Sequence, residues 1–292
     1  MRSLLFVPGD SERKLAKGVA SGADVLIIDL EDSVAAANKP VARAMARDFI
    51  KALPRGSAPK IYVRVNDLST GLSEDDLAAV IGARPDGIML PKCNSASDLS
   101  QLSAMLRVHE AEGNLDDGAT KIIAIMTETA AGVLSASTYR DPNPRLAGLT
   151  WGAEDLSASV GATTARDENG RYTDVFRLAR AVTILAASAV EVAAVDTVFV
   201  NFRDGDGLRR ECVEAARDGF TAKMAIHPDQ VPVINETFTP SKDAVAHAKM
   251  LMQAFAEAGN PGVVGIGGQM FDRPHLRRAE RLLARAAAAG VA

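Results

Sequence analysis

Eight short apolar runs recur along the chain, and longer amphipathic segments separate them. Most of the runs are continuous and rich in Leu or β-branched residues, which is typical of strands buried on both faces. The runs are Leu4–Val7, Val25–Leu30, Ile61–Val65, Gly87–Leu90, Ile122–Met126, Leu146–Trp151, Thr197–Val200 and Ala222–Ile226. This alternation predicts a parallel (β/α)8 barrel, the TIM barrel, rather than an open doubly wound sheet, because about 230 residues for eight strands suits closure.

The segments between the runs carry helical periodicity, as the crossovers of a parallel barrel require. Helices are predicted at Glu12–Ala20, Pro40–Leu53, Asp75–Ile81, Ala96–Glu112 and Tyr172–Ala194. The rhythm then changes to a helix near Lys242–Ala258, a glycine-rich hairpin and a last helix near Pro274–Ala289. We therefore expect a barrel domain over residues 1–237 and a small helical C-terminal module over residues 238–292.

Composition narrows the class of protein. The chain has 292 residues and a formal net charge of −4, and it lacks a Lys/Arg block, which argues against nucleic acid as a partner. No apolar window reaches the length of a membrane span, and the first apolar run is too short for a secretory signal. Cys93 and Cys212 are far apart without a metal-type spacing, which indicates a reducing compartment. We expect a soluble, cytoplasmic protein without a membrane partner.

Charged residues stand at the ends of the second and third predicted strands, where barrels place their chemistry. Asp29, Glu31 and Asp32 follow the second run, and Arg64 lies between valines in the third. Buried charges need partners, so we interpret Asp29 as facing a metal or a cation, and Arg64 as facing a substrate carboxylate or developing enolate. The alternatives are an acidic cluster at a helix N-terminus and a purely structural ion pair with Arg64.

Two further carboxylates follow neighbouring strands. Glu128 comes two residues after the fifth run, and Asp155 comes shortly after the sixth, with no histidine nearby. Mg²⁺ prefers oxygen ligands and usually takes one or two carboxylates, leaving room for water and substrate. Each residue alone could simply cap the following helix, but together with Arg64 the pair favours a Mg²⁺ site. Lys92 and His227 also end strands, and we interpret Lys92 as an ion-pair partner of the acidic cluster and His227 as structural.

These motifs occur in one order along the chain. They are Arg2–Gly9, Asp29–Asp32, Lys39 with Arg43, Val63–Asn66, Leu90–Lys92, Glu128–Ala130, Gly152–Leu156 and Ile226–Pro228. The ordered set resembles the citrate lyase β-subunit-like family, within the HpcH/HpaI aldolase superfamily, over essentially the whole chain. The resemblance implies a Mg²⁺-dependent TIM-barrel lyase that makes or breaks a carbon–carbon bond between an acyl-CoA enolate and a 2-oxo acid.

The resemblance also implies roles for single residues. Glu128 and Asp155 would hold Mg²⁺, and Arg64 would contact the 2-oxo acid and polarise its carbonyl. The groups that hold metal waters and Arg64 would include Asp29, Glu31 and Asp32. The chain departs from the family pattern at Thr127, where the family usually has an apolar residue, and we expect Thr127 to point away from the metal.

The C-terminal module adds a further expectation. Residues 267–274 resemble the lid motif of stand-alone acyl-CoA lyases, in which an aspartate reaches the active site of a neighbouring subunit and acts as acid and base. Asp272 matches that position, which implies a homo-oligomer, expected to be a trimer. From the residues alone, Asp272 is also a good N-cap for the last helix, with Pro274 in its first turn.

The leading hypothesis is cleavage of citramalyl-CoA or malyl-CoA to acetyl-CoA and pyruvate or glyoxylate, or the reverse condensation. Arg13, Lys17 and Lys39 are candidates for contacts to CoA phosphates, with an ordinary solvated face as the alternative for each. Two other readings stay open. One is a citryl-thioester lyase β subunit within a citrate lyase complex, which the lid with Asp272 disfavours. The other is a CoA-independent aldolase acting on free 2-oxo acids.

Overall fold

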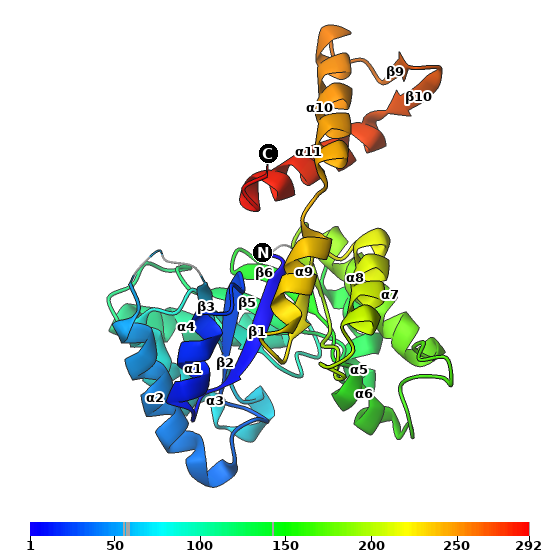
Figure 1. Ribbon diagram of the computed structural model, residues 1–292. Helices are drawn as coiled ribbons and strands as arrows, with labels where there is room; N and C mark the ends of the chain where they lie inside the picture. The colour runs from blue at the N-terminus through cyan, green and yellow to red at the C-terminus, as the bar shows by residue number, and fades with distance from the viewer. Residues whose placement is uncertain (55, 57–58, 142, 292) are drawn as a thin grey trace.

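Eight parallel strands close into a barrel in the order of the sequence (Figure 1). The computed structural model describes residues 1–54, 56, 59–141 and 143–291. The strands are β1 (Ser3–Pro8), β2 (Val25–Asp29), β3 (Lys60–Arg64), β4 (Gly87–Leu90), β5 (Lys121–Ile125), β6 (Leu146–Thr150), β7 (Ala193–Asp196) and β8 (Ala222–Ala225). The barrel closes where β1 pairs with β8, from Ser3 opposite Lys223 to Leu5 opposite Ala225. The predicted (β/α)8 fold is therefore confirmed.

Helices follow the strands and form the outer layer of the barrel. They are α1 (Glu12–Val19), α2 (Lys39–Ala52), α3 (Ser73–Val80), α4 (Ala96–Glu112), α5 (Ala130–Leu134), α6 (Ala153–Val160), α7 (Asp174–Ala189), α8 (Gly205–Asp218) and α9 (Gln230–Phe238). Short 3-10 helices lie at Ala36–Asn38, Leu68–Thr70, Ile81–Ala83 and Ala136–Thr138. Over the described part of the chain, no helix is both long and apolar enough to cross a membrane.

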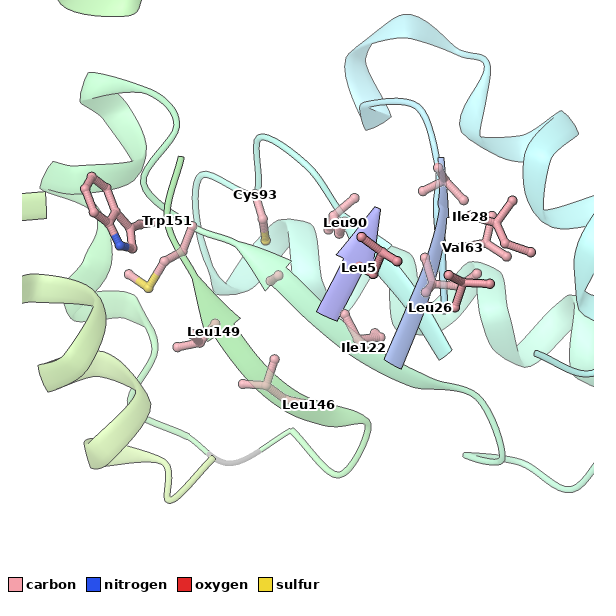
Figure 2. Close-up of a cluster of buried hydrophobic side chains, with 14 of the residues drawn as sticks. Leu5, Leu26, Ile28, Val63, Leu90, Cys93, Ile122, Leu146, Leu149 and Trp151 are labelled. Carbon is pink, nitrogen blue, oxygen red and sulfur yellow. The ribbon is translucent and has the colours of Figure 1, made fainter. Parts of the chain in front are cut away.

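The strands are apolar on both faces because they separate two cores. Val25 and Ile27 of β2 point into the barrel interior, where they pack with residues such as Met89 and Met224. The alternate residue Leu26 points outward into a larger core between strands and helices, part of which Figure 2 shows. Alternation of side chains along a strand places neighbours on opposite faces. Two apolar faces therefore explain why the runs in the sequence are continuous.

The seventh predicted strand is wrong. Strand β7 is Ala193–Asp196, directly before the run Thr197–Val200, and it pairs with β6 from Gly148 onward. The run itself has no regular secondary structure, and Val200 is exposed. Helix α7 also ends earlier than predicted, at Ala189. Glycine suits position 148 of β6, because a Cβ atom there would lie 3.2 Å from the carbonyl oxygen of Ala193 in β7.

The C-terminal segment folds around a small core of its own. Helices α10 (Lys242–Glu257) and α11 (Arg273–Ala288) flank an antiparallel hairpin of β9 (Val263–Ile266) and β10 (Gln269–Asp272). Phe255 of α10 is among the buried residues of this core. The two helices and the hairpin lie where the sequence predicted them.

This C-terminal module lies at the end of the barrel where the strands begin (Figure 1). In the middle of α11, Arg281 lies 3.2 Å from Glu191, which precedes β7. Arg2, which precedes β1, donates to Thr239 in the loop before α10. The module of one chain is therefore on the opposite side of the barrel from the carboxyl ends of its own strands.

Candidate active site

Two carboxylates from neighbouring strands meet at the carboxyl end of the barrel. Glu128 follows β5 and is 3% exposed, and Asp155 lies in the first turn of α6, which follows β6. The side chain of Glu128 rests against the backbone of Gly152, where a Cβ atom would lie 2.6 Å from the Glu128 Cγ atom. A glycine is therefore required at this position to let Glu128 reach the turn that begins α6.

Glu128 has too few partners to ionise easily. Among the described residues, its carboxylate accepts from the backbone N–H of Lys92, which lies 2.6 Å from Oε2. Burial and the nearby charge of Asp155 together raise the pKa of Glu128 to about 8. A divalent cation between two such carboxylates would remove this penalty, because it supplies the charge that they lack.

Lys92 links this pair to the acidic residues after β2. Its Nζ atom donates to Glu31 Oε1 at 2.6 Å and lies 3.3 Å from Asp155 Oδ1. The backbone of Lys92 is left-handed, with φ of 49°, which is an uncommon conformation for a residue with a side chain. In this conformation the N–H of Lys92 donates to Glu128 while its side chain donates to Glu31. The ion-pair role that the sequence suggested for Lys92 is confirmed.

Arg64 is fixed from two sides. Its Nε and Nη2 atoms donate to the two oxygens of Asp29, each at 2.7 Å, and its Nη1 atom lies 2.9 Å from Glu31 Oε2. The ring of Phe6 stacks on the guanidinium at 4.9 Å. Burial opposes ionisation of Asp29, but its bonds to Arg64 outweigh burial and hold the pKa of Asp29 below its ordinary value. Arg64 thus makes the structural ion pair and still stands at the barrel mouth.

The remaining acidic residues differ in exposure. Burial raises the pKa of Glu31, and its Oε2 atom has no hydrogen bond of good geometry among the described residues. The side chain of Asp32 is 59% exposed and lies 3.6 Å from Arg64. The cluster is therefore short of positive charge, since the five carboxylates face two cations. The five are Asp29, Glu31, Asp32, Glu128 and Asp155, and the cations are Arg64 and Lys92.

This donor set fits a hard divalent cation. The described residues hold no group of three or more His, Cys, Asp or Glu arranged for a metal ion. A site with two carboxylates and no thiolate or imidazole is typical of Mg²⁺, which keeps several waters, and not of structural zinc. The neighbouring Thr127 points away from the carboxylates toward α7, where its hydroxyl lies 3.4 Å from that of Thr183, as expected.

The three basic residues proposed for CoA differ in position. Arg13 and Lys17 lie exposed on α1, which begins just after the carboxyl end of β1. Lys39 does not fit that role, because its ammonium donates to the carbonyls of Leu30 and Glu31 and to Asn66 Oδ1. Three acceptors use all three of its protons, so Lys39 is a structural residue that holds the loop after β2.

Asp272 lies far from these residues within one chain. It is the N-cap of α11 and forms a capping box with His275, whose Nδ1 atom is 2.5 Å from Asp272 Oδ1.

His227, interpreted as structural, is half-buried and stacks on Phe202 at 4.7 Å between ring centres. A surface cavity of about 330 Å³ lies at the other end of the barrel, beside Lys121 and Arg145, and contains none of the predicted site residues.

Sequence reasoning missed a buried polar cluster beside the carboxylates. Trp151, directly after β6, donates from Nε1 to Asp196 Oδ1 at 2.8 Å, and Lys223 of β8 donates to Asp196 Oδ2 at 2.8 Å. Asp196 and Lys223 are fully buried. Asp196 was overlooked because the seventh strand was placed after it. A charged residue such as Lys223 within an apolar run was the available signal.

A closed parallel barrel with a carboxylate pair and a fixed arginine at its carboxyl end defines a TIM-barrel enzyme. Residues 2–228 match the family model described as HpcH/HpaI aldolase/citrate lyase, and the chain belongs to this family. It is an enzyme of the carbon–carbon lyase class to which this family belongs.

The similar proteins share nearly the full length of the chain. The citrate lyase subunit beta-like protein of Mycobacterium tuberculosis is 36% identical over 97% of this chain and 94% of its own. The mitochondrial citramalyl-CoA lyase of Rattus norvegicus is 33% identical over 97% of this chain and 85% of its own. The crystal structure of M. tuberculosis CitE in complex with magnesium, acetoacetate and coenzyme A matches with a TM-score of 0.78, 36% identity and 98% coverage of both chains.

Proposed function

We propose that this chain is a Mg²⁺-dependent lyase that cleaves a 3-hydroxyacyl-CoA of the citramalyl-CoA or malyl-CoA type. The products are acetyl-CoA and a 2-oxo acid, pyruvate or glyoxylate, and the reverse condensation uses the same groups. The observation that carries the proposal is the meeting of the buried Glu128 with Asp155, which follows the next strand, at the barrel mouth that also holds the fixed Arg64. The relatives whose names include citramalyl-CoA lyase, magnesium and coenzyme A support it.

Glu128 and Asp155 are the residues that would hold the cation. When bound there, Mg²⁺ supplies Lewis-acid polarisation of the substrate oxygens. Glu128 is fixed by the Lys92 N–H and by the backbone of Gly152, so its carboxylate is oriented before substrate arrives. A preorganised ligand lowers the reorganisation that binding requires.

Arg64 is the residue that we assign to the 2-oxo acid. Asp29 occupies one edge of its guanidinium and Glu31 faces the other, so the plane and the charge of Arg64 are fixed at the mouth. A fixed guanidinium stabilises a carboxylate, and negative charge that develops on a carbonyl oxygen during bond cleavage. Asp32 is largely exposed and would order water beside Arg64.

The C-terminal module, residues 238–292, would act as a lid on another copy of the chain. Asp272 cannot serve its own barrel, because the module lies at the end where the strands begin (Figure 1). We therefore assign Asp272 to proton transfer in the site of a neighbouring subunit, within a homo-oligomer expected to be a trimer. Arg13 and Lys17 on the exposed face of α1 are the remaining candidates for CoA phosphates.

One second candidate has a specific observation in its favour. A citrate lyase subunit beta-like protein is among the similar proteins, so action on a citryl thioester within a citrate lyase complex is the alternative. The test is an assay of the purified chain alone with citramalyl-CoA, malyl-CoA and citryl-CoA, in Mg²⁺ and in EDTA. Mg²⁺-dependent release of acetyl-CoA with pyruvate or glyoxylate supports the proposal. Cleavage of the citryl ester alone supports the alternative, and cleavage of free 2-oxo acid aldols alone supports a CoA-independent aldolase.

A further inference from the structure

A series of buried polar contacts begins at Trp151, the residue between β6 and the carboxylate site. The indole N–H of Trp151 donates to Asp196 at the end of β7, at 2.8 Å. Lys223 of β8 donates to the other oxygen of Asp196 at 2.8 Å and to Glu211 of α8 at 2.7 Å. Asp196 and Lys223 have no exposed surface. The contacts thus cross the space between the strands and the outer helices.

The series of contacts returns to Trp151. Glu211 accepts from Arg166 Nη2 at 2.6 Å, and Arg166 lies in the loop between α6 and α7. The guanidinium of Arg166 stacks on the ring of Tyr172 at 3.8 Å. Tyr172 in turn meets Trp151 edge to face, with 5.0 Å between ring centres. These six residues form a closed ring of contacts, which we call the Trp151 ring.

Stability alone does not account for this ring. A buried ion-pair network gains little over well-packed apolar residues, because removing its charges from water offsets their attraction. What such a network does provide is one fixed geometry, since each partner has hydrogen-bonding directions that must be met. The relevant question is which part of the molecule this fixed geometry holds.

The ring holds the turn that bears Asp155 and supports the side chain of Glu128. Trp151 is followed at once by Gly152, against which Glu128 lies, and then by Ala153, where α6 begins. Asp155 is in the first turn of that helix. A shift of the Trp151 indole would therefore move the surface under Glu128 and the start of the helix that bears Asp155.

We propose that the Trp151 ring positions Glu128 and Asp155 for a divalent cation, with Asp196 and Arg166 as positioning residues. The inference rests on the proposed function, since it assumes a cation at those carboxylates. Residues that orient metal ligands without touching the metal typically alter metal affinity by about 10- to 100-fold when they are replaced. A ring that served only stability would change the melting temperature and leave cation affinity unchanged.

The experiment measures Mn²⁺ binding to the full chain by electron paramagnetic resonance of the free ion. Trp151→Phe keeps an aromatic ring in place and removes the N–H that Asp196 accepts. Arg166→Gln removes the ion pair with Glu211 at the partly exposed side of the Trp151 ring, without leaving a cavity among the barrel strands. We expect the Mn²⁺ Kd to rise about 10-fold in each variant that folds. Melting temperatures identify any variant that does not fold. The Mn²⁺ Kd of the other variant then tests the inference.

Asp117→Asn is the matched control. Asp117 is the exposed outer partner of a second buried network, Arg145 with Glu110, at the opposite ends of β5 and β6. Its replacement therefore removes an outer ion pair as Arg166→Gln does, but far from Glu128. We expect its Mn²⁺ Kd to match that of the unaltered chain.

The outcomes separate the inference from the function beneath it. If the unaltered chain binds Mn²⁺ and both ring variants bind it within about twofold of that Kd, the inference is overturned and the proposed function stands. If the unaltered chain does not bind Mn²⁺, or binds it no better than Glu128→Gln does, the proposed function and the inference are both overturned. Weakening in Asp117→Asn equal to that in the ring variants also overturns the inference.

Discussion

Two buried glutamates lie at opposite ends of the same pair of strands, and their pKa values are shifted in opposite directions. Glu110 lies beside the beginnings of β5 and β6, and Glu128 lies beside their carboxyl ends. Their exposed fractions are 1% and 3%. Burial opposes ionisation of both, so the difference must come from their partners.

The partners differ in number and in charge. Glu110 accepts two bonds from Arg145, each at 2.7 Å, and two backbone N–H bonds, and these outweigh burial and lower the pKa of Glu110 to about 2. Glu128 accepts one N–H bond and faces the charge of Asp155, which adds to burial and raises the pKa of Glu128 to about 8. A satisfied buried charge is typical of structural positions, whereas strongly raised carboxyl pKa values cluster at functional sites.

The largest expected effect is at the unsatisfied end. Replacing Glu128 with Ala removes one of the two proposed cation ligands, so we expect kcat/KM for the CoA ester to fall by about 10³-fold or more. Steady-state assays in saturating Mg²⁺ measure this change. Turnover within tenfold of the unaltered chain would show that Glu128 is not part of the catalytic site.

The same substitution type at the satisfied end should act on folding. Glu110→Gln leaves Arg145 buried without its full partner, and we expect the free energy of unfolding to fall by about 3–5 kcal/mol. Glu128→Gln should leave the metal-free chain at least as stable as before, because it removes a poorly partnered charge. Urea denaturation in EDTA compares the two variants. Equal losses in both would remove the distinction between the two ends.

Arg64 differs from both glutamates, because it is paired with Asp29 and Glu31 and yet lies at the carboxyl end of the barrel, beside the candidate site. Arg64→Lys keeps the charge but loses the fork that Asp29 accepts, so we expect kcat to fall by about 10²- to 10³-fold. Mn²⁺ affinity serves as the control, and we expect it to change much less. Unchanged kcat would assign Arg64 to structure alone.

Asp272 is an exception to this division, since it lies beyond the end of its own barrel where the strands begin, yet we assign it to the reaction. As a proton-transfer group for a neighbouring subunit, its replacement in Asp272→Asn should lower turnover by about 10²-fold while Mn²⁺ binding persists. Mixing Asp272→Asn with Glu128→Ala should restore part of the activity, because a mixed oligomer contains sites with both residues intact. Absence of any restoration in verified mixed oligomers would contradict action between subunits.

The smallest expected effect is on the pH dependence of stability. Glu128 has an ordinary pKa of 4.5 and a folded-state pKa of about 8, so the folded chain binds the extra proton between these values. Stability of the metal-free chain should therefore fall as pH rises through this window. Glu128→Gln lacks this titrating carboxyl group. We expect its melting temperature to exceed that of the unaltered chain by a few degrees at pH 9 and to differ little at pH 5. The reverse trend would contradict the raised pKa.

Local pattern was sufficient for most of the barrel. Strands such as β4 and helices such as α4 match their predicted bounds, because apolar periodicity is set by the two cores on either side of each strand. Strand β7 was missed, because it holds two alanines and an aspartate, whereas the run Thr197–Val200 that follows it is more strongly apolar.

The residues of the candidate site could be predicted from the sequence, but their hydrogen-bond partners could not. Strand ends gave Glu128, Asp155 and Arg64 as charged residues at one barrel mouth, which the structure brings there. The sequence could not reveal that Lys39 uses all its protons on nearby acceptors. It could not reveal the contacts of Asp196 either, since these join β7 to Lys223 of β8 and to Trp151 directly after β6, and depend on the closed barrel.

The Trp151 ring has an optical consequence. Trp151 is the single tryptophan of the chain, and it lies one residue from the turn that supports Glu128. Its emission is therefore free of contributions from other indoles and arises beside the proposed cation site. Under excitation selective for tryptophan, the unaltered enzyme carries its own fluorophore, so changes at the barrel mouth during ligand binding are open to stopped-flow observation without any attached dye.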